Sequence, residues 1–205
     1  MNKNLLIIFA KNPELGAVKT RLAKTIGKAA ALEIYIKLLE KTVSITENLE
    51  LDKVVYYHEK IETDDLWDPK NFNKALQIGN DLGEKMNDAF HSAFNEGYKN
   101  VCIIGSDCFE LTADIVNQAF TALNSKEAVI GAAEDGGYYL LGMSQYMPDF
   151  FENKAWSTDK VFSSTKKDFI KLGLSFTELT VLKDVDVEAD LGDWAKTSNF
   201  EKFSD

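Results

Sequence analysis

The sequence has few cysteines and no long hydrophobic run, and each shortage excludes a class of protein. Its N-terminal apolar run extends only from Leu5 to Ala10, which is too short for a signal-peptide core or for a membrane span of ~20 apolar residues. The two cysteines, Cys102 and Cys108, lack the CxxC spacing of zinc and redox motifs. Since nothing indicates a disulfide framework, we expect a protein of the reducing cytoplasm.

Positive charge is also scarce. The chain has 23 lysines and arginines against 33 aspartates and glutamates, which gives a formal net charge of −10. Nucleic-acid binding requires a broad positive surface that displaces counterions, so we expect no nucleic-acid partner. A small phosphorylated ligand is compatible with this composition, because it needs only a local basic pocket.

What the sequence does contain is a regular alternation of apolar runs and amphipathic stretches. The 205 residues, of which 45% are hydrophobic, predict one domain over residues 1–205 with a full core. Strands are expected at 4–10, 53–58, 101–105, 128–132, 138–143 and 175–182, and helices at 28–49, 82–96, 113–123 and 158–172. This alternation predicts an α/β fold with a mostly parallel sheet, in which residues 138–143 form an antiparallel insertion.

Several polar residues stand where helices are expected to begin. Asp81 and Thr112 are predicted to cap the second and third long helices, and Ser157 to cap the fourth. Asp186 is predicted to cap a last short helix, and the polar tail after Ala195 is expected to fray.

The loop after the first strand, within "FAKNPELGAVKTRL", carries the basic residues Lys11, Lys19 and Arg21 around a bend at Pro13 and Gly16. In open α/β sheets, ligands bind beyond the carboxyl ends of the strands. Basic side chains and free backbone amides at such a turn favour an anion site, where arginine contacts phosphate oxygens in pairs. The alternative for this loop is a solvated basic turn.

Three other loops carry unusual carboxylates. Asp107 follows a buried strand in "IIGSDCFEL" and suits a hard divalent cation, although it could instead cap a helix. Asp135 begins a turn in "EDGGYY" that is either a plain hairpin or a turn beside a ligand. Asp184 and Asp186 alternate at strand spacing, so one of them could complete a metal site with Asp107, unless Asp186 only caps a helix and Asp184 is solvated.

Taken together, six segments resemble the nucleotide-diphospho-sugar transferase superfamily with the Rossmann-like GT-A fold, in its bacterial, uncharacterised glycosyltransferase-like branch. The segments are "FAKNPELGAVKTRL", "QIGNDLGEKM", "IIGSDCFEL", "EDGGYYLLG", "WST" and "DVDVEADL". They occur in the order of the family and cover the chain up to about Trp194. The sequence departs from the family at three positions, namely Lys85 for a common arginine, Phe109 for a common proline and Val187 for a usual threonine. The change at Phe109 raises the question of how the acceptor entrance is shaped.

The resemblance implies a role for each of these segments. It assigns the nucleotide phosphates to Lys11, Lys19 and Arg21, the base to Gln77 and Gly83, and a Mg²⁺ or Mn²⁺ ion to Asp107 with Asp184 or Asp186. It directs Asp135 and Tyr138 toward the acceptor, and the paired glycines Gly136 and Gly137 allow a backbone to approach a substrate closely.

The leading hypothesis is a metal-dependent transferase that moves a sugar from a nucleoside-diphosphate sugar to an acceptor, with Asp107 and Asp135 in the catalytic roles. Cation and basic residues would stabilise the departing diphosphate. The main alternative is a nucleotidyltransferase that uses a nucleoside triphosphate and releases pyrophosphate, since only Asp107, and no full Asp-x-Asp, follows the third long strand. A third reading is a non-catalytic nucleotide-binding protein on the same fold.

Overall fold

Strand β1, Asn4–Ala10, lies in the centre of the sheet and divides the core into two layers. Because side chains alternate along a strand, Leu6 and Ile8 point to one face and Leu5 and Ile7 to the other. All four side chains are buried. The computed structural model describes residues 4–195 and confirms the predicted bounds of this strand.

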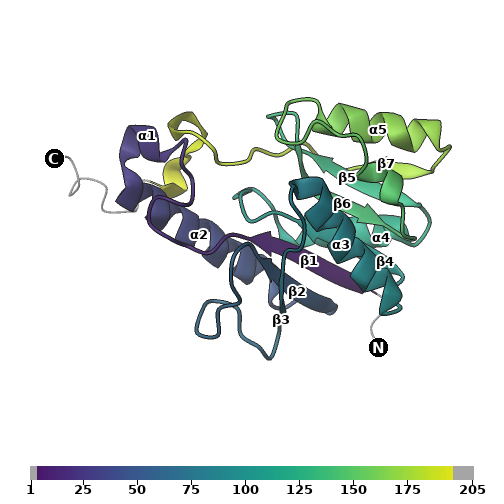
Figure 1. Cartoon of the computed structure of the whole chain (residues 1–205), viewed down its shortest axis with the longest axis horizontal. Helices are drawn as coiled ribbons and strands as arrows, with labels where there is room; N and C mark the ends of the chain where they lie inside the picture. Colours follow the sequence, from purple (N-terminus) through teal and green to yellow (C-terminus); the bar gives the residue numbers. More distant parts are fainter. Residues whose placement is uncertain (1–3, 196–205) are drawn as a thin grey trace.

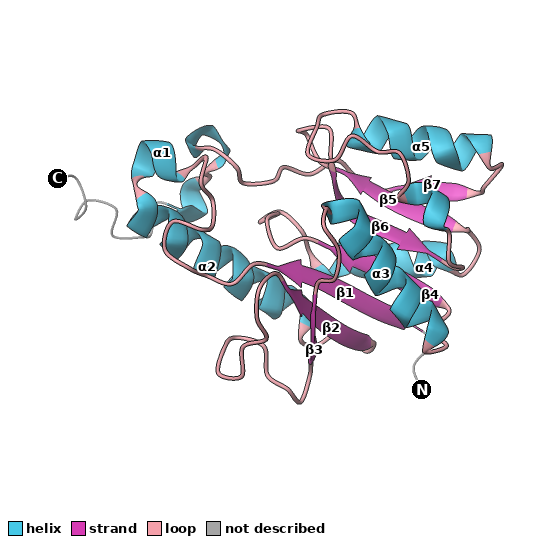
Figure 2. Ribbon diagram, viewed as in Figure 1, coloured by secondary structure: helices cyan, strands magenta, loops and turns pink. Residues whose placement is uncertain are grey.

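The sheet has seven strands in the order β3-β2-β1-β4-β6-β5-β7. The other strands are β2 (Asp52–Tyr57), β3 (Asn73–Leu76), β4 (Asn100–Ile104), β5 (Ala128–Ala132), β6 (Tyr138–Met143) and β7 (Phe176–Glu178). Every pairing is parallel except those of β6 with β4 and β5, so the predicted antiparallel insertion is confirmed (Figure 2).

Helices cover both faces of the sheet (Figure 1). They are α1 (Ala23–Ile26), α2 (Lys28–Thr46), α3 (Leu82–Asn95), α4 (Ala113–Leu123) and α5 (Val161–Lys171). The buried side chains of α2 and α4 pack on the face that bears Leu6, and those of α3 and α5 on the face that bears Leu5. The chain is thus a single α/β domain, as predicted. No helix within residues 4–195 is long and apolar enough to cross a membrane.

Two of the predicted helix caps are confirmed. The Asp81 carboxylate accepts a hydrogen bond from the Glu84 backbone N–H at the start of α3, and the Thr112 hydroxyl accepts one from Ile115 at the start of α4. The expectation for Ser157 is wrong, because α5 begins only at Val161 and Ser157 adopts a left-handed backbone conformation with φ of 62°.

Three further expectations differ from the structure. The strand expected at 175–182 is reduced to β7, with an isolated bridge between Ala133 and Leu182. Strand β3, Asn73–Leu76, is not among the predicted strands. Asp186 does not cap the short helix Glu188–Asp190, because that helix begins after Val187 and the Asp190 carboxylate accepts from the Asp186 and Val187 backbone amides. The polar tail beyond Ala195 lies outside the described residues.

The segment after β7 returns across the carboxyl ends of the strands to α1 and α2 (Figure 1). It ends in two short 3-10 helices, Glu188–Asp190 and Asp193–Ala195. Val185 and Ala195 are buried against Leu22, Ile34 and Leu38 in a small cluster of their own. This packing anchors the segment that carries Asp184 and Asp186.

Candidate functional site

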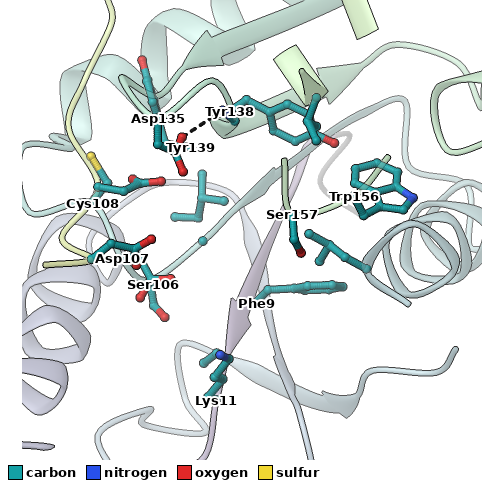
Figure 3. A pocket seen from close by; sticks show the side chains of 18 of the residues that line it. Phe9, Lys11, Ser106, Asp107, Cys108, Asp135, Tyr138, Tyr139, Trp156 and Ser157 are labelled. Carbon is teal, nitrogen blue, oxygen red and sulfur yellow. Dashed lines mark hydrogen bonds between the residues drawn. The ribbon is translucent and has the colours of Figure 1, made fainter. Parts of the chain in front are cut away.

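A cavity of about 830 Å³ lies where β1 and β4 end side by side. The sheet order reverses direction between these two strands, and such a switch point opens a crevice in α/β folds. The residues that follow both strands, Lys11 and Asp107, line the cavity (Figure 3). Its volume suits a ligand of nucleotide size. All the predicted site residues except Gly83 and Gly136 are among its lining residues, which also include Phe9, Tyr35, His58, Lys85 and Trp156.

Tyr35, which is buried on α2, ties the two central loops together. Its hydroxyl accepts a hydrogen bond from the Lys11 backbone N–H at 2.7 Å and lies 3.2 Å from both the Lys11 carbonyl and the Ser106 hydroxyl. Burial raises the pKa of Tyr35, and the nearby Asp107 carboxylate raises it further. The hydroxyl therefore stays protonated, and its hydrogen bonds hold together the two loops that follow β1 and β4.

Lys19 is the central cation of the acidic end of the cavity, which also contains Asp107, Asp184 and Asp186. Its side chain is only 4% exposed, and its Nζ lies 2.5 Å from Oδ1 of Asp107 and 3.7 Å from Oδ1 of Asp186. The same ammonium donates to the Val185 carbonyl at 2.7 Å. The structure thus places Lys19 against protein oxygens, and its expected contact with phosphate stays a prediction.

Two further contacts join the C-terminal segment to the central loops. The Val185 backbone N–H donates to the Asp107 carbonyl at 3.0 Å. Arg21, whose side chain is 67% exposed, donates to Oδ2 of Asp186 at 3.2 Å. Residues more than 160 positions apart in the chain are therefore brought together around Asp107.

Asp184 has the most perturbed carboxyl group of the cavity. Burial raises its pKa to about 7, and the negative charges of Asp107, Asp135 and Asp186 contribute, while Lys19 opposes the shift. Each of these carboxylates therefore lies close enough to Asp184 to act on its charge. The site carries more negative charge than its own cations neutralise.

The turn between β5 and β6 brings Asp135 to the cavity. Oδ1 of Asp135 accepts the Gly137 backbone N–H at 2.8 Å, shown as the dashed line in Figure 3. Gly136 has a φ of 87°, and a Cβ atom there would lie 2.2 Å from the Asp159 carbonyl oxygen. The close backbone approach expected at these glycines thus occurs within the protein, at Gly136, and the role of Gly137 toward a substrate stays a prediction. Tyr138 lines the cavity, and its hydroxyl donates to Sδ of Met86 at 3.6 Å.

The residues predicted to contact a base are engaged with the protein. The Gln77 amide donates to the carbonyls of Tyr56 at 2.9 Å and Ala10 at 3.3 Å, so it bridges neighbouring strand ends. Gly83 is buried beneath the Trp156 indole, whose Nε1 would lie 2.2 Å from a Cβ atom at that position. Their contact with a base stays a prediction.

Phe109 does not line the cavity. Its ring stacks on Trp194 with centroids 4.0 Å apart and planes 8° apart, and the Lys41 ammonium lies 5.5 Å from its centroid. The change from proline at this position therefore supports the C-terminal segment and does not shape the entrance.

Sequence reasoning missed the roles of Tyr35 and Trp156, and it did not predict the contact between His58 and Lys85. Tyr35 belongs to the apolar face of a helix, where nothing distinguishes it from other core residues. Trp156 lies in the quoted segment "WST", which was the available signal for it. Nζ of Lys85 lies 3.2 Å from Nδ1 of His58, although the two residues are 27 positions apart.

At the acidic end, the side chains that could bind a metal offer carboxylate oxygens, which are the ligands that Mg²⁺ and Mn²⁺ prefer. Burial is the main cause of the raised pKa of Asp184, and the negative charges of Asp107, Asp135 and Asp186 add to it. Several carboxylates that act on one another in this way have a chemistry that fits a divalent cation. Among the residues that the structure describes, no three side chains of Asp, Glu, His or Cys already form a group that could hold a metal ion.

The fold and the position of the site define a member of the nucleotide-diphospho-sugar transferase superfamily with the GT-A fold, in its bacterial, uncharacterised branch. A solved structure from Desulfovibrio desulfuricans G20, described as a candidate nucleotide-diphospho-sugar transferase, is 31% identical. The comparison covers 100% of this chain and 92% of that one, with a TM-score of 0.86. Residues 42–158 match the family described as "Uncharacterized protein conserved in bacteria (DUF2064)", and the chain belongs to this family.

More distant structures share the fold alone. The 4-diphosphocytidyl-2C-methyl-D-erythritol synthase of Anaerococcus prevotii DSM 20548 is 11% identical with a TM-score of 0.55, covering 91% of this chain and 92% of its own. The inositol-1-phosphate CTP transferase of T. maritima is 11% identical with a TM-score of 0.53, covering 96% and 93%. No protein with a curated description matches the sequence.

Proposed function

We propose that the protein is a metal-dependent transferase that takes a nucleoside-diphosphate sugar and transfers its sugar to an acceptor. The observation that carries this proposal is the group of four carboxylates, Asp107, Asp135, Asp184 and Asp186, which surrounds the end of a basic loop at the switch point of the sheet. An acidic site of this kind binds an anionic diphosphate only if a cation bridges the two.

The residues that would hold Mg²⁺ or Mn²⁺ are Asp107, Asp184 and Asp186. When bound, such a cation supplies Lewis-acid stabilisation of a departing diphosphate. Lys19 already neutralises part of the charge of Asp107 and Asp186, so it competes with a cation for the same oxygens.

The remaining residues bind and orient the substrates. Arg21 is largely exposed and, once released from Asp186, can present two N–H groups to phosphate oxygens. Lys11 adds a second positive charge at the end of β1. Asp135 would accept a proton from the acceptor hydroxyl, a base that an enzyme inverting the sugar configuration requires and a retaining one does not.

Calorimetry with UDP or GDP in the presence of Mn²⁺ tests this function. We expect wild-type protein to bind one of the two nucleotides only with the metal, and Asp107→Asn to lose most of that binding. Asp64→Asn is the matched control, because Asp64 is exposed outside the cavity and its substitution removes the same charge. Equal binding by Asp107→Asn and wild type would refute the metal assignment.

A nucleotidyltransferase is the second candidate, and two observations favour it. Strand β4 is followed by one cavity carboxylate, Asp107, instead of a full Asp-x-Asp pair. Two of the distant structures with this fold are cytidylyltransferases by their descriptions. Pyrophosphate release from CTP and a sugar phosphate, measured beside sugar release from UDP-glucose, separates the two reactions.

A further inference from the structure

A second group of positive charges lines the cavity in addition to Lys19 and Arg21. Strands β1 and β2 are paired so that Ala10 lies opposite Tyr57. The next residues, Lys11 and His58, therefore leave the same edge of the sheet from neighbouring strands, and both line the cavity. Lys85 reaches the same wall from the first turn of α3.

His58 and Lys85 are in direct contact. Nζ of Lys85 lies 3.2 Å from Nδ1 of His58, a hydrogen-bond distance at which the imidazole ring orients the ammonium. Loop 58–62 is itself fixed, because the buried Asn12 accepts the backbone amides of Glu59 and Lys60 through its side-chain oxygen. The position of His58 is thus set by the first loop, the same loop that carries Lys11.

Two of the carboxylates close to Lys85 in the chain, those of Asp81 and Glu84, are engaged elsewhere. Asp81 accepts the Glu84 backbone N–H, and the Glu84 carboxylate accepts the backbone and side-chain N–H groups of Asn80. Within residues 4–195, neither Lys11 nor Lys85 lies within salt-bridge distance of a carboxylate. In a protein with a net charge of −10, two lysines that face a cavity without a carboxylate partner form a local positive patch.

We propose that Lys11, His58 and Lys85 form a phosphoryl-binding subsite, separate from the carboxylates that would hold a metal. Lys11 and Lys85 supply two positive charges, and His58 holds one of them in place. The ligand is a phosphate group, which accepts hydrogen bonds from several ammonium groups at once. The subsite binds phosphate without a metal, so it does not depend on the transferase reaction.

The two histidines of the chain provide a direct test. His58 lies in the subsite, whereas His91 is exposed on α3 beside Tyr146 and does not line the cavity. Inorganic phosphate is titrated at constant pH and ionic strength, without metal or nucleotide, while the ring resonances of both histidines are followed by NMR. We expect a saturable shift of the His58 resonances and no shift of the His91 resonances.

Three variants complete the test. Lys85→Gln is expected to weaken the phosphate affinity reported by His58 by about tenfold, the size expected for loss of one charge-assisted hydrogen bond. Lys85→Arg retains the charge and is expected to retain the binding. Lys99→Gln removes an exposed lysine outside the cavity and should leave the affinity unchanged.

Two results would overturn the subsite: equal, unsaturable shifts of both histidines, or an unchanged affinity in Lys85→Gln. Failure of nucleotide binding to require Mn²⁺ would refute the proposed function and leave the subsite intact. A repeat with UDP and Mn²⁺ distinguishes the sources of the phosphoryl group. If UDP and Mn²⁺ abolish the phosphate-induced shift of the His58 resonances, the subsite belongs to the phosphates of the nucleotide. If the shift remains, the subsite belongs to a second, phosphorylated substrate.

Discussion

The acidic end and the glycine end of the cavity are built in opposite ways. The acidic end comprises Lys19, Asp107, Asp184 and Asp186, and its charges are only partly balanced. At the glycine end, the lining segment Trp156–Asp159 packs on Gly83 and Gly136, which do not themselves line the cavity, at distances that leave no room for a Cβ atom. Protein contacts satisfy the glycine end, whereas the acidic end still needs positive charge.

This difference explains which part of the cavity is prepared for chemistry. A fully packed region gains nothing from a ligand in the same place, because the ligand must first displace protein atoms. A region with excess negative charge gains stability from any cation that neutralises it.

The largest effect is expected from Gly136→Ala. The residue combines a φ of 87° with a contact of 2.2 Å between a Cβ atom and the Asp159 carbonyl, so backbone strain and a backbone clash add. We expect a loss of about 3 kcal/mol in the free energy of unfolding, measured by urea denaturation.

The control for this variant is Gly97→Ala, where φ is 92° and nothing lies within 4 Å of the added Cβ atom. It reports the strain alone, at about 1 kcal/mol. Equal losses in the two variants would show that Asp159 does not pack on Gly136 as described.

The next effect is expected from Lys19→Met, which removes the cation from the acidic end. The ammonium is nearly inaccessible, while the Asp107 side chain is 45% exposed. Solvent therefore screens part of the pair, and we expect a loss of about 2 kcal/mol at pH 7.5.

A double-mutant cycle with Asp107→Asn isolates the contribution of the pair itself. Added Mn²⁺ should restore part of the stability of Lys19→Met, because a divalent cation neutralises the same carboxylates. A coupling energy of zero in the cycle would contradict the ion pair.

Asp184→Asn is expected to stabilise the protein at neutral pH. Because the folded-state pKa is raised to about 7, the native state keeps a proton that the unfolded state loses above pH 4. The wild type therefore loses stability as the pH rises from about 4 to 7, at up to about 1.4 kcal/mol per pH unit.

The variant lacks this titration, so its stability relative to wild type should rise across the same window. We expect an advantage on the order of a few kcal/mol at pH 7.5, and almost none near pH 4. A constant difference at all pH values would show that Asp184 titrates normally.

The smallest effect on stability is expected from Arg21→Gln. The Arg21–Asp186 pair is exposed on both sides, and such pairs contribute less than about 0.5 kcal/mol. Nucleotide affinity in the presence of Mn²⁺ should nevertheless fall several-fold, because the exposed guanidinium can exchange its contact with Asp186 for phosphate oxygens. A large loss of stability with unchanged nucleotide affinity would show that Arg21 stabilises the fold and does not bind the nucleotide.

Sequence reasoning succeeded where the signals are local. The strand Asn4–Ala10 and the helix Ala113–Leu123 were predicted at their observed bounds, because an unbroken apolar run and a threonine cap each lie within a few residues. It failed at β3, Asn73–Leu76, which is a short, partly exposed edge strand with little apolar pattern. It also failed at Ser157, where the backbone is left-handed with a φ of 62° and α5 begins only at Val161.

The carboxylate loops of the site were predicted because each follows a strand, and parallel strands place their carboxyl ends at one edge. The partners within the site were not predicted. Lys19 meets Val185 across 166 positions, and no local pattern encodes a contact over that distance. The same holds for the hydrogen bond between Tyr35 and the Lys11 backbone, since Tyr35 has the helical periodicity of a core residue.

The central claim is that the acidic end binds a divalent cation together with a nucleotide. A crystal soaked with UDP and Mn²⁺ tests it most directly through the anomalous signal of manganese. We predict one anomalous peak at the Asp107, Asp184 and Asp186 carboxylates, with the Lys19 ammonium displaced from Asp107. A bound nucleotide without such a peak, or a peak away from these three residues, would contradict the account.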